Sequence, residues 1–166
     1  MKIFLSFFVC FFFQFNVASS LIQVDITRGN LDPLPIAVSP LHVDANSQSL
    51  KDLKVKELGE KISEIIENNF RGTGLFNPLK KDAFVQNADI AHLKPRFEDW
   101  RLITAQALVT GKILVKDDKL KIEFRLWDLT ASKEMIALAF TTTPSNWRRV
   151  AHIISDKIYE RLTGEE

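Results

Sequence analysis

Residues that could catalyse a reaction or bind a metal ion are few and widely separated in this 166-residue chain. Its three histidines stand in three different contexts: His42, His92 and His152. None lies in a His-x-x-x-His or Glu-x-x-His arrangement, the spacing that places two metal ligands on one face of a helix. We therefore predict that each histidine is satisfied within the fold or faces solvent, and that the chain binds no metal.

Other common catalytic patterns are also missing from the sequence. Gly72-Thr73-Gly74 lacks the preceding strand and the lysine of a phosphate-binding loop, and the end of a helix explains it better. There is no Gly-x-Ser-x-Gly motif, and the single cysteine, Cys10, lies in an apolar leader. We predict a protein that is not an enzyme and has no cofactor. The alternative, a hydrolase with an unrecognised acidic site, would need two or more carboxylates converging in one pocket.

The elements that would position any site are organised around the segment Lys119–Asp128. Its apolar residues fall on one side, and these are Leu120, Ile122, Phe124 and Leu126. A period of two over this length predicts a half-buried antiparallel strand, with one face covered and the other facing water. Ala107–Val115 and Met135–Thr141 flank it across short turns, which predicts a three-stranded meander.

Two amphipathic helices are predicted to cover the buried face of this sheet. The first has Val55, Leu58, Ile62, Ile65, Ile66 and Phe70 at three- and four-residue spacing; the last has Trp147, Val150, Ala151, Ile154, Ile158 and Leu162. A shorter helix is expected over Pro95–Ile103 and a short strand over Ile36–Leu41. The segment Leu41–Gln48 is expected to be a polar loop. The pattern of Lys80–Lys94 assigns no structure to that segment. This order predicts an α+β fold, a mixed sheet of about five strands with two main helices packed on one face.

The first twenty residues read as a signal peptide that contributes nothing to the fold. Lys2 precedes an apolar run, Ile3–Phe15, and small residues up to Ser20 predict cleavage there or one or two residues earlier. The run is too short to span a bilayer comfortably, although a retained anchor is the alternative. Residues 21–166 would then form one secreted domain without an integral membrane segment. Loss of Lys2 leaves 21 basic and 21 acidic residues, a balance that indicates neither nucleic acid nor an anionic membrane surface as partner.

The candidate binding residues lie at the new N-terminus and on the central strand. The terminal segment comprises Leu21, Ile22, Gln23, Val24, Asp25, Ile26 and Thr27, and its isoleucines and valine share one side. A short alternating arm with one free end is suited to adding a strand to a partner's sheet; the alternative is pairing with its own sheet. Trp127 is the second candidate, because an aromatic on the polar face of a strand marks a partner surface or lies beneath a loop. We favour the loop.

Five motifs follow one another over nearly all of residues 21–166: Gly29–Leu41, Phe70–Leu79, Trp100 followed by Ala107–Ile113, Leu126–Asp128 and Ile158–Gly164. In their order and spacing, these motifs together resemble the N-terminal domain of the TolB family of the periplasmic Tol-Pal envelope system. The resemblance implies a periplasmic protein, non-catalytic, that supports outer-membrane integrity and constriction during cell division. It also implies that Leu21–Thr27 engages the C-terminal domain of TolA.

Members of that family continue into a β-propeller that makes the main contact with the Pal lipoprotein. This sequence ends at Glu166, so the resemblance does not imply that it binds Pal. It is expected to be either a fragment or a shortened gene product. A second function remains open: a stand-alone periplasmic accessory or ligand-binding module with the same fold.

Overall fold

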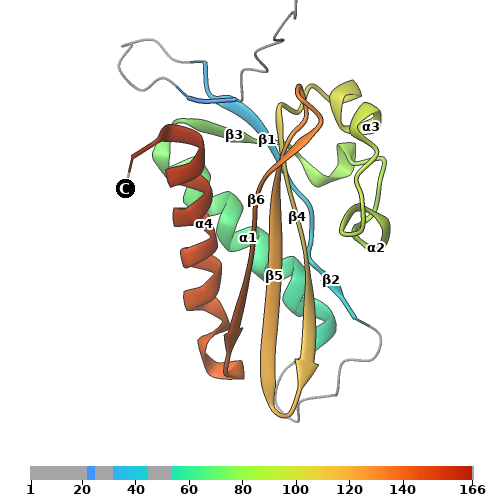
Figure 1. The fold of residues 1–166 in the computed structure, drawn as a ribbon, viewed down its shortest axis with the longest axis vertical. Helices are drawn as coiled ribbons and strands as arrows, with labels where there is room; N and C mark the ends of the chain where they lie inside the picture. The colour runs from blue at the N-terminus through green and yellow to red at the C-terminus, as the bar shows by residue number, and fades with distance from the viewer. Residues whose placement is uncertain (1–21, 25–31, 45–53, 166) are drawn as a thin grey trace, which may run out of the picture.

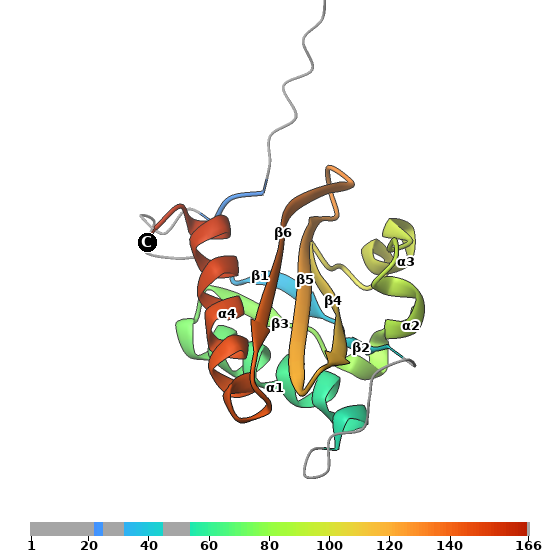
Figure 2. The same cartoon turned by 60° about the horizontal axis from the view of Figure 1, so that its bottom comes forward.

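A mixed six-stranded β-sheet forms the centre of the fold, and helices pack against both of its faces (Figure 1, Figure 2). The computed structural model describes residues 22–24, 32–44 and 54–165. The predicted signal peptide lies outside these ranges, as do Leu21 and Asp25–Thr27 of the predicted arm. Among the helices in the described ranges, none has the length and apolar character needed to cross a membrane.

Strands and helices alternate along the first part of the chain, and three consecutive strands precede the last helix. The strands are β1 (Leu34–Val38), β2 (His42–Val43), β3 (Phe76–Pro78), β4 (Ala107–Lys116), β5 (Lys119–Asp128) and β6 (Lys133–Thr142). The α-helices are α1 (Val55–Thr73), α2 (Ala88–Ala91), α3 (Phe97–Leu102) and α4 (Trp147–Thr163), and two 3-10 helices are η1 (Lys81–Ala83) and η2 (Pro144–Asn146).

The sheet combines parallel and antiparallel pairs in the order β3-β1-β4-β5-β6, with β2 paired to β4. β1 runs parallel to β3 and β4, and β2 also runs parallel to β4. β4, β5 and β6 are antiparallel, with Ile113 opposite Ile122 and Phe124 opposite Leu138. The predicted meander and the α+β class are therefore confirmed, with six strands where about five were expected.

The main hydrophobic core lies between one face of the sheet and the pair α1 and α4. Leu120, Ile122, Phe124 and Leu126 of β5 are at most 1 % exposed. They meet apolar stripes of both helices: Leu58, Ile62, Ile66 and Phe70 of α1, and Val150, Ala151, Ile154, Ile158 and Leu162 of α4. Burying each large apolar side chain contributes about 1.5–3 kcal/mol to the free energy of unfolding. Gly74 and Gly164 end the two helices in the left-handed conformation, as their sequence positions predicted.

A second, smaller layer covers part of the opposite face. There Trp100 of α3 is buried beside Leu108 of β4, and its indole nitrogen donates to Gln86 Oε1 at 3.0 Å. This layer includes η1 and α2, which come from the segment Lys80–Lys94 that sequence periodicity left unassigned. The missing periodicity is explained by the shortness of these helices, each a single turn or little more.

Two expectations about the N-terminal strands were wrong. β1 begins at Leu34 and ends at Val38, although the pattern placed it at Ile36–Leu41. The expected polar loop Leu41–Gln48 instead begins with β2, whose two residues pair with Lys112 and Ile113 of β4. Such pairing joins residues about seventy positions apart, and local composition does not reveal it.

The helix α1 approaches the connection between β1 and β2 so closely that only glycine fits at one position. Leu41 donates its backbone N–H to Gly59 O at 3.2 Å. A Cβ added at Gly59 would lie 1.9 Å from Leu41 O, a separation that requires the backbone to move. Gly72, near the other end of α1, has no neighbouring atom within 4 Å of an added Cβ.

These two glycines give a matched test of the packing between α1 and the sheet. We expect Gly59→Ala to lower the free energy of unfolding by about 1–3 kcal/mol, because overpacking must displace Leu41. Gly72→Ala should raise it by about 0.5–1 kcal/mol, because alanine loses less backbone entropy in a helix. Urea denaturation of both variants would measure the changes, and equal shifts would contradict the close approach.

Candidate protein-interaction site

The described part of the arm, Ile22–Val24, lies between the C-terminal end of α4 and the end of β5 (Figure 2). Val24 donates its backbone N–H to Leu162 O at 2.8 Å, and Ile22 donates its own to Asp128 Oδ2 at 2.9 Å. Neither bond belongs to a β-ladder. Ile22 and Val24 are half-buried against the main core while Gln23 is exposed, in agreement with the predicted alternation.

Asp128 is the anchor of this docked segment. It is 0 % exposed, and its second oxygen, Oδ1, accepts the backbone N–H of Ala131 at 2.8 Å. It therefore joins the arm to the β5–β6 turn. Sequence reasoning missed it, although a signal was present: after Leu120, Ile122, Phe124 and Leu126, the next position facing the core is Asp128.

The end of α4 supplies the other half of the docking site. The last carbonyls of a helix have no partner within the helix, so they need donors from elsewhere. Leu162 O receives one from Val24, and the N–H of Gly164 turns back to Glu160 O at 2.9 Å. The arm thus satisfies a backbone group that the helix leaves open.

Trp127 is covered by the second layer. This residue is half-buried, and its ring packs edge to face with that of Phe97, the two ring centroids being 5.8 Å apart. Its indole nitrogen donates to Thr110 Oγ1 at 2.9 Å. The element that packs on this ring is the helix α3, where the sequence led us to expect a loop. The assignment of Trp127 as a partner-binding residue stays a prediction.

Two of the histidines lie closer together than their separation in sequence suggested. The rings of His42 and His92 stack with centroids 4.1 Å apart, and His42 Nδ1 lies 2.7 Å from Asp89 Oδ1. His152 lies elsewhere, on α4, beside Asn69. Across the described ranges, no group of three or more histidine, cysteine, aspartate or glutamate residues is arranged to hold a metal ion.

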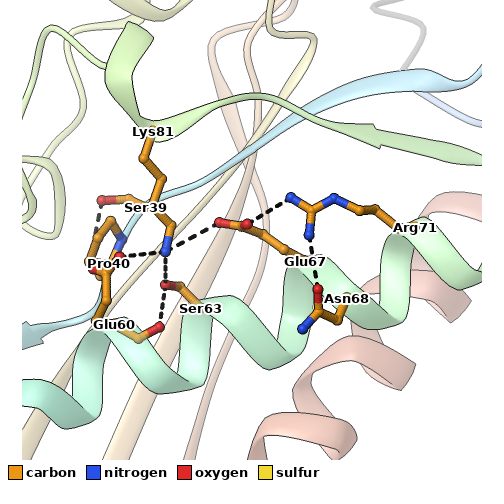
Figure 3. A network of polar contacts seen from close by, with 8 residues as sticks. All are labelled: Ser39, Pro40, Glu60, Ser63, Glu67, Asn68, Arg71 and Lys81. Atoms are coloured by element: carbon orange, nitrogen blue, oxygen red, sulfur yellow. Dashed lines mark hydrogen bonds and ion pairs between the residues drawn. The ribbon is translucent and has the colours of Figure 1, made fainter.

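A network of charged residues ties η1 to α1 (Figure 3). Lys81 Nζ donates to Glu60 Oε1 at 2.6 Å and to Ser63 Oγ at 3.0 Å, and it lies 3.5 Å from Glu67 Oε1. Glu67 is buried, and Arg71 Nη2 donates to its other oxygen at 3.0 Å. The network fastens the beginning of the second layer to the helix layer through the buried carboxylate.

Two surface hollows offer little for catalysis. One, of about 300 Å³, lies between His92 and β6; the other, of about 250 Å³, lies beside Lys81. Each is lined by one carboxylate, Glu123 or Glu60, so neither shows the convergent pair that hydrolysis would need. A hydrogen bond from Lys121 holds the pKa of Glu123 below its ordinary value, which suits an ion pair and not a general acid.

Comparison with known proteins adds one family and several related structures. The family model of the TolB amino-terminal domain matches residues 22–135, beginning within the arm. The Tol-Pal system protein TolB of Pelagibacter ubique (strain HTCC1062) is 66 % identical over 151 residues, which is 90 % of this chain and 34 % of that protein. The chain thus spans about a third of the length of this curated relative.

Two solved structures share the fold. The crystal structure of TolB from Acinetobacter baumannii superposes with a TM-score of 0.63 at 22 % identity, covering 80 % of this chain and 29 % of that one. A PelC dodecamer from Paraburkholderia phytofirmans gives a TM-score of 0.50 at 16 % identity, covering 80 % of this chain and 92 % of that one. At these identities the likeness concerns the fold alone.

The contacts of Trp127 predict a measurable loss of stability. We expect Trp127→Ala to lower the free energy of unfolding by roughly 2–3 kcal/mol, below the value of about 3–5 for a fully buried tryptophan. Trp127→Phe keeps a ring against Phe97 but loses the hydrogen bond to Thr110 and part of the packed ring, so it should lower the free energy of unfolding by about 1–2 kcal/mol, less than the alanine variant. If Trp127→Ala lowers the free energy of unfolding by less than about 0.5 kcal/mol, the ring is exposed to solvent and this account of its packing is wrong.

The charged network predicts a different outcome for two lysines that both pair with glutamate. Lys81→Met should lower the free energy of unfolding by about 1–3 kcal/mol, because buried Glu67 loses one of its two cations. Lys61→Met breaks an exposed pair with Glu57 and should leave the thermal midpoint nearly unchanged. Thermal unfolding measures both, and similar midpoints would show that the Lys81 network is as dispensable as a surface pair.

Proposed function

Because this chain belongs to the TolB amino-terminal domain family, we propose that it is a periplasmic interaction domain of the Tol-Pal system that binds the C-terminal domain of TolA through Leu21–Thr27. In this role it supports outer-membrane integrity and constriction during cell division. It performs no catalysis and uses no cofactor. The proposal further includes cleavage of a signal peptide near Ser20.

The observation that carries this proposal is the way the arm is held. Its described part makes two backbone hydrogen bonds to the rest of the domain, one to a helix end and one to a single side chain. A hydrogen bond between neutral groups contributes about 0.5–1.5 kcal/mol net and one to a charged group about 1.5–3 kcal/mol, so these two bonds allow release at moderate cost. A segment near a chain terminus is also easily mobilised, because few contacts depend on it.

The same side chains would serve both the docked and the bound state. Ile22 and Val24 pack partly against the domain's own core, so a partner that buries them requires the arm to leave. Strand addition to a partner sheet would replace two backbone hydrogen bonds with a ladder and would bury the same apolar side more completely. Binding would therefore be a competition between two sites for one segment.

Deletion of Leu21–Thr27 tests the proposal directly. We expect titration calorimetry against the TolA C-terminal domain to show no binding, while the melting curve stays cooperative because α1, α4 and the meander remain. Gln23→Ala is the matched control, since this exposed side chain lies within the arm but on its other side.

Two results would count against this role. Unchanged affinity of the deletion variant would place the partner surface elsewhere or favour a stand-alone periplasmic accessory or ligand-binding module. Loss of the cooperative transition would show that the arm is an integral part of the core.

A further inference from the structure

Gln86 carries a buried hydrogen-bond donor that has no partner among the described residues. The residue is 2 % exposed, and its Oε1 accepts the backbone N–H of Arg96 at 2.9 Å and the indole N–H of Trp100 at 3.0 Å. Both partners are donors, so the amide oxygen must lie on their side and Nε2 on the other. A buried N–H group without an acceptor is costly, so an acceptor beside Nε2 would stabilise this arrangement.

The hollow beside Lys81, of about 250 Å³, lies next to this donor. Gln86 lines the hollow, whereas Arg96 and Trp100 do not, so the hollow is on the Nε2 side of the amide. It is enclosed by the connection between β1 and β2, by α1, and by the segment that joins η1 to α2. Its volume is below the roughly 300–1,000 Å³ of sites for drug-sized ligands, so it suits a group about as large as one amino-acid residue.

The other walls of the hollow favour an uncharged ligand with an apolar part. Phe84 and Pro40 contribute apolar surface. Lys81 and Glu60 also line the hollow, and their charged groups pair with each other at 2.6 Å (Figure 3). Even with Lys81 bound to Oε1, the carboxylate of Glu60 has lone pairs left for an N–H donor. The walls thus combine one neutral donor, one acceptor and an apolar surface.

We propose that this hollow binds one peptide group, with a small apolar side chain, from an extended segment of a partner protein. A secondary amide has one acceptor and one donor. Its carbonyl oxygen accepts from Gln86 Nε2, and its N–H donates to Glu60. The side chain beside it packs on Phe84 and Pro40.

An exposed apolar residue beside the hollow favours a peptide over a small molecule. Val85 is 63 % exposed, although it stands in sequence between two residues that line the hollow. A peptide that continues past the hollow would cover this side chain, and a molecule confined to the hollow would not. The described residues of the arm, Ile22–Val24, do not line the hollow, so this inference does not depend on TolA binding.

Nuclear magnetic resonance of the isotope-labelled chain tests the proposal. The probe is a trialanine peptide with an acetylated N-terminus and an amidated C-terminus, which is uncharged and has small side chains. We expect the side-chain Nε2 signals of Gln86 and the backbone amide signals of Phe84 and Ala88 to move and to saturate together as the peptide is added. The signals are read in the unaltered protein, so this result requires no variant.

Gln86→Glu removes the proposed donor. Its carboxylate still offers one oxygen to Arg96 and Trp100, but it places a second oxygen where Nε2 stood. We expect the dissociation constant of the peptide to rise about tenfold or more, because the ligand's carbonyl loses its donor. Gln106→Glu is the matched control, since it makes the same chemical change at an exposed glutamine that does not line the hollow, and it should leave the dissociation constant unchanged.

Three results would overturn the proposal. The first is that the Gln86 side-chain signals do not move when the peptide is added. The second is that N-acetylglucosamine, which carries the same amide group on a sugar ring, moves these signals while the peptide does not, because the ligand is then a small molecule. The third is an equal effect of Gln86→Glu and Gln106→Glu on the dissociation constant, which would show that the change in net charge and not the lost donor is responsible.

Discussion

The alternation of side chains along β5 is the constraint on which the rest of the structure depends. Its inward series begins at Leu120, continues through Phe124 and ends at Asp128, so one register places the apolar members under α1 and α4. A slip by one residue would turn the whole series toward solvent, which is why the register is strongly specified. The same register carries a carboxylate to the end of the core, where it meets Ile22.

Structural elements could be predicted from the sequence where their side-chain pattern repeats within a short stretch of chain. The period of two in β5 and the three- and four-residue spacing in α1 and α4 identified the meander and its covering helices. Features fixed by distant contacts were not predictable in this way. The two residues of β2 pair with β4, and the short helices of the second layer hold Trp100 through Gln86. Asp128 could have been identified by extending the inward series by one position.

The two layers differ in how they relate to the proposed partner. The layer of α1 and α4 forms the stable core and offers the carbonyl of Leu162 at its end. The layer of α2 and α3 covers Trp127 and is fastened to α1 through Lys81 (Figure 3). The arm is attached to the first layer and to the end of the sheet, through few contacts. A stable core that holds one terminal segment through few contacts is suited to adding that segment as a strand to a partner's sheet.

The central claim is that the arm leaves its docking site to bind TolA, and nuclear magnetic resonance of the isotope-labelled chain tests it most directly. On addition of the unlabelled TolA C-terminal domain, we expect the amide signals of Ile22 and Val24 to move, together with those beside Asp128 and Leu162. Signals of α2 and α3 around Trp100 should stay in place. Shifts confined to α2 and α3, with Ile22 and Val24 unchanged, would contradict the arm as the binding element.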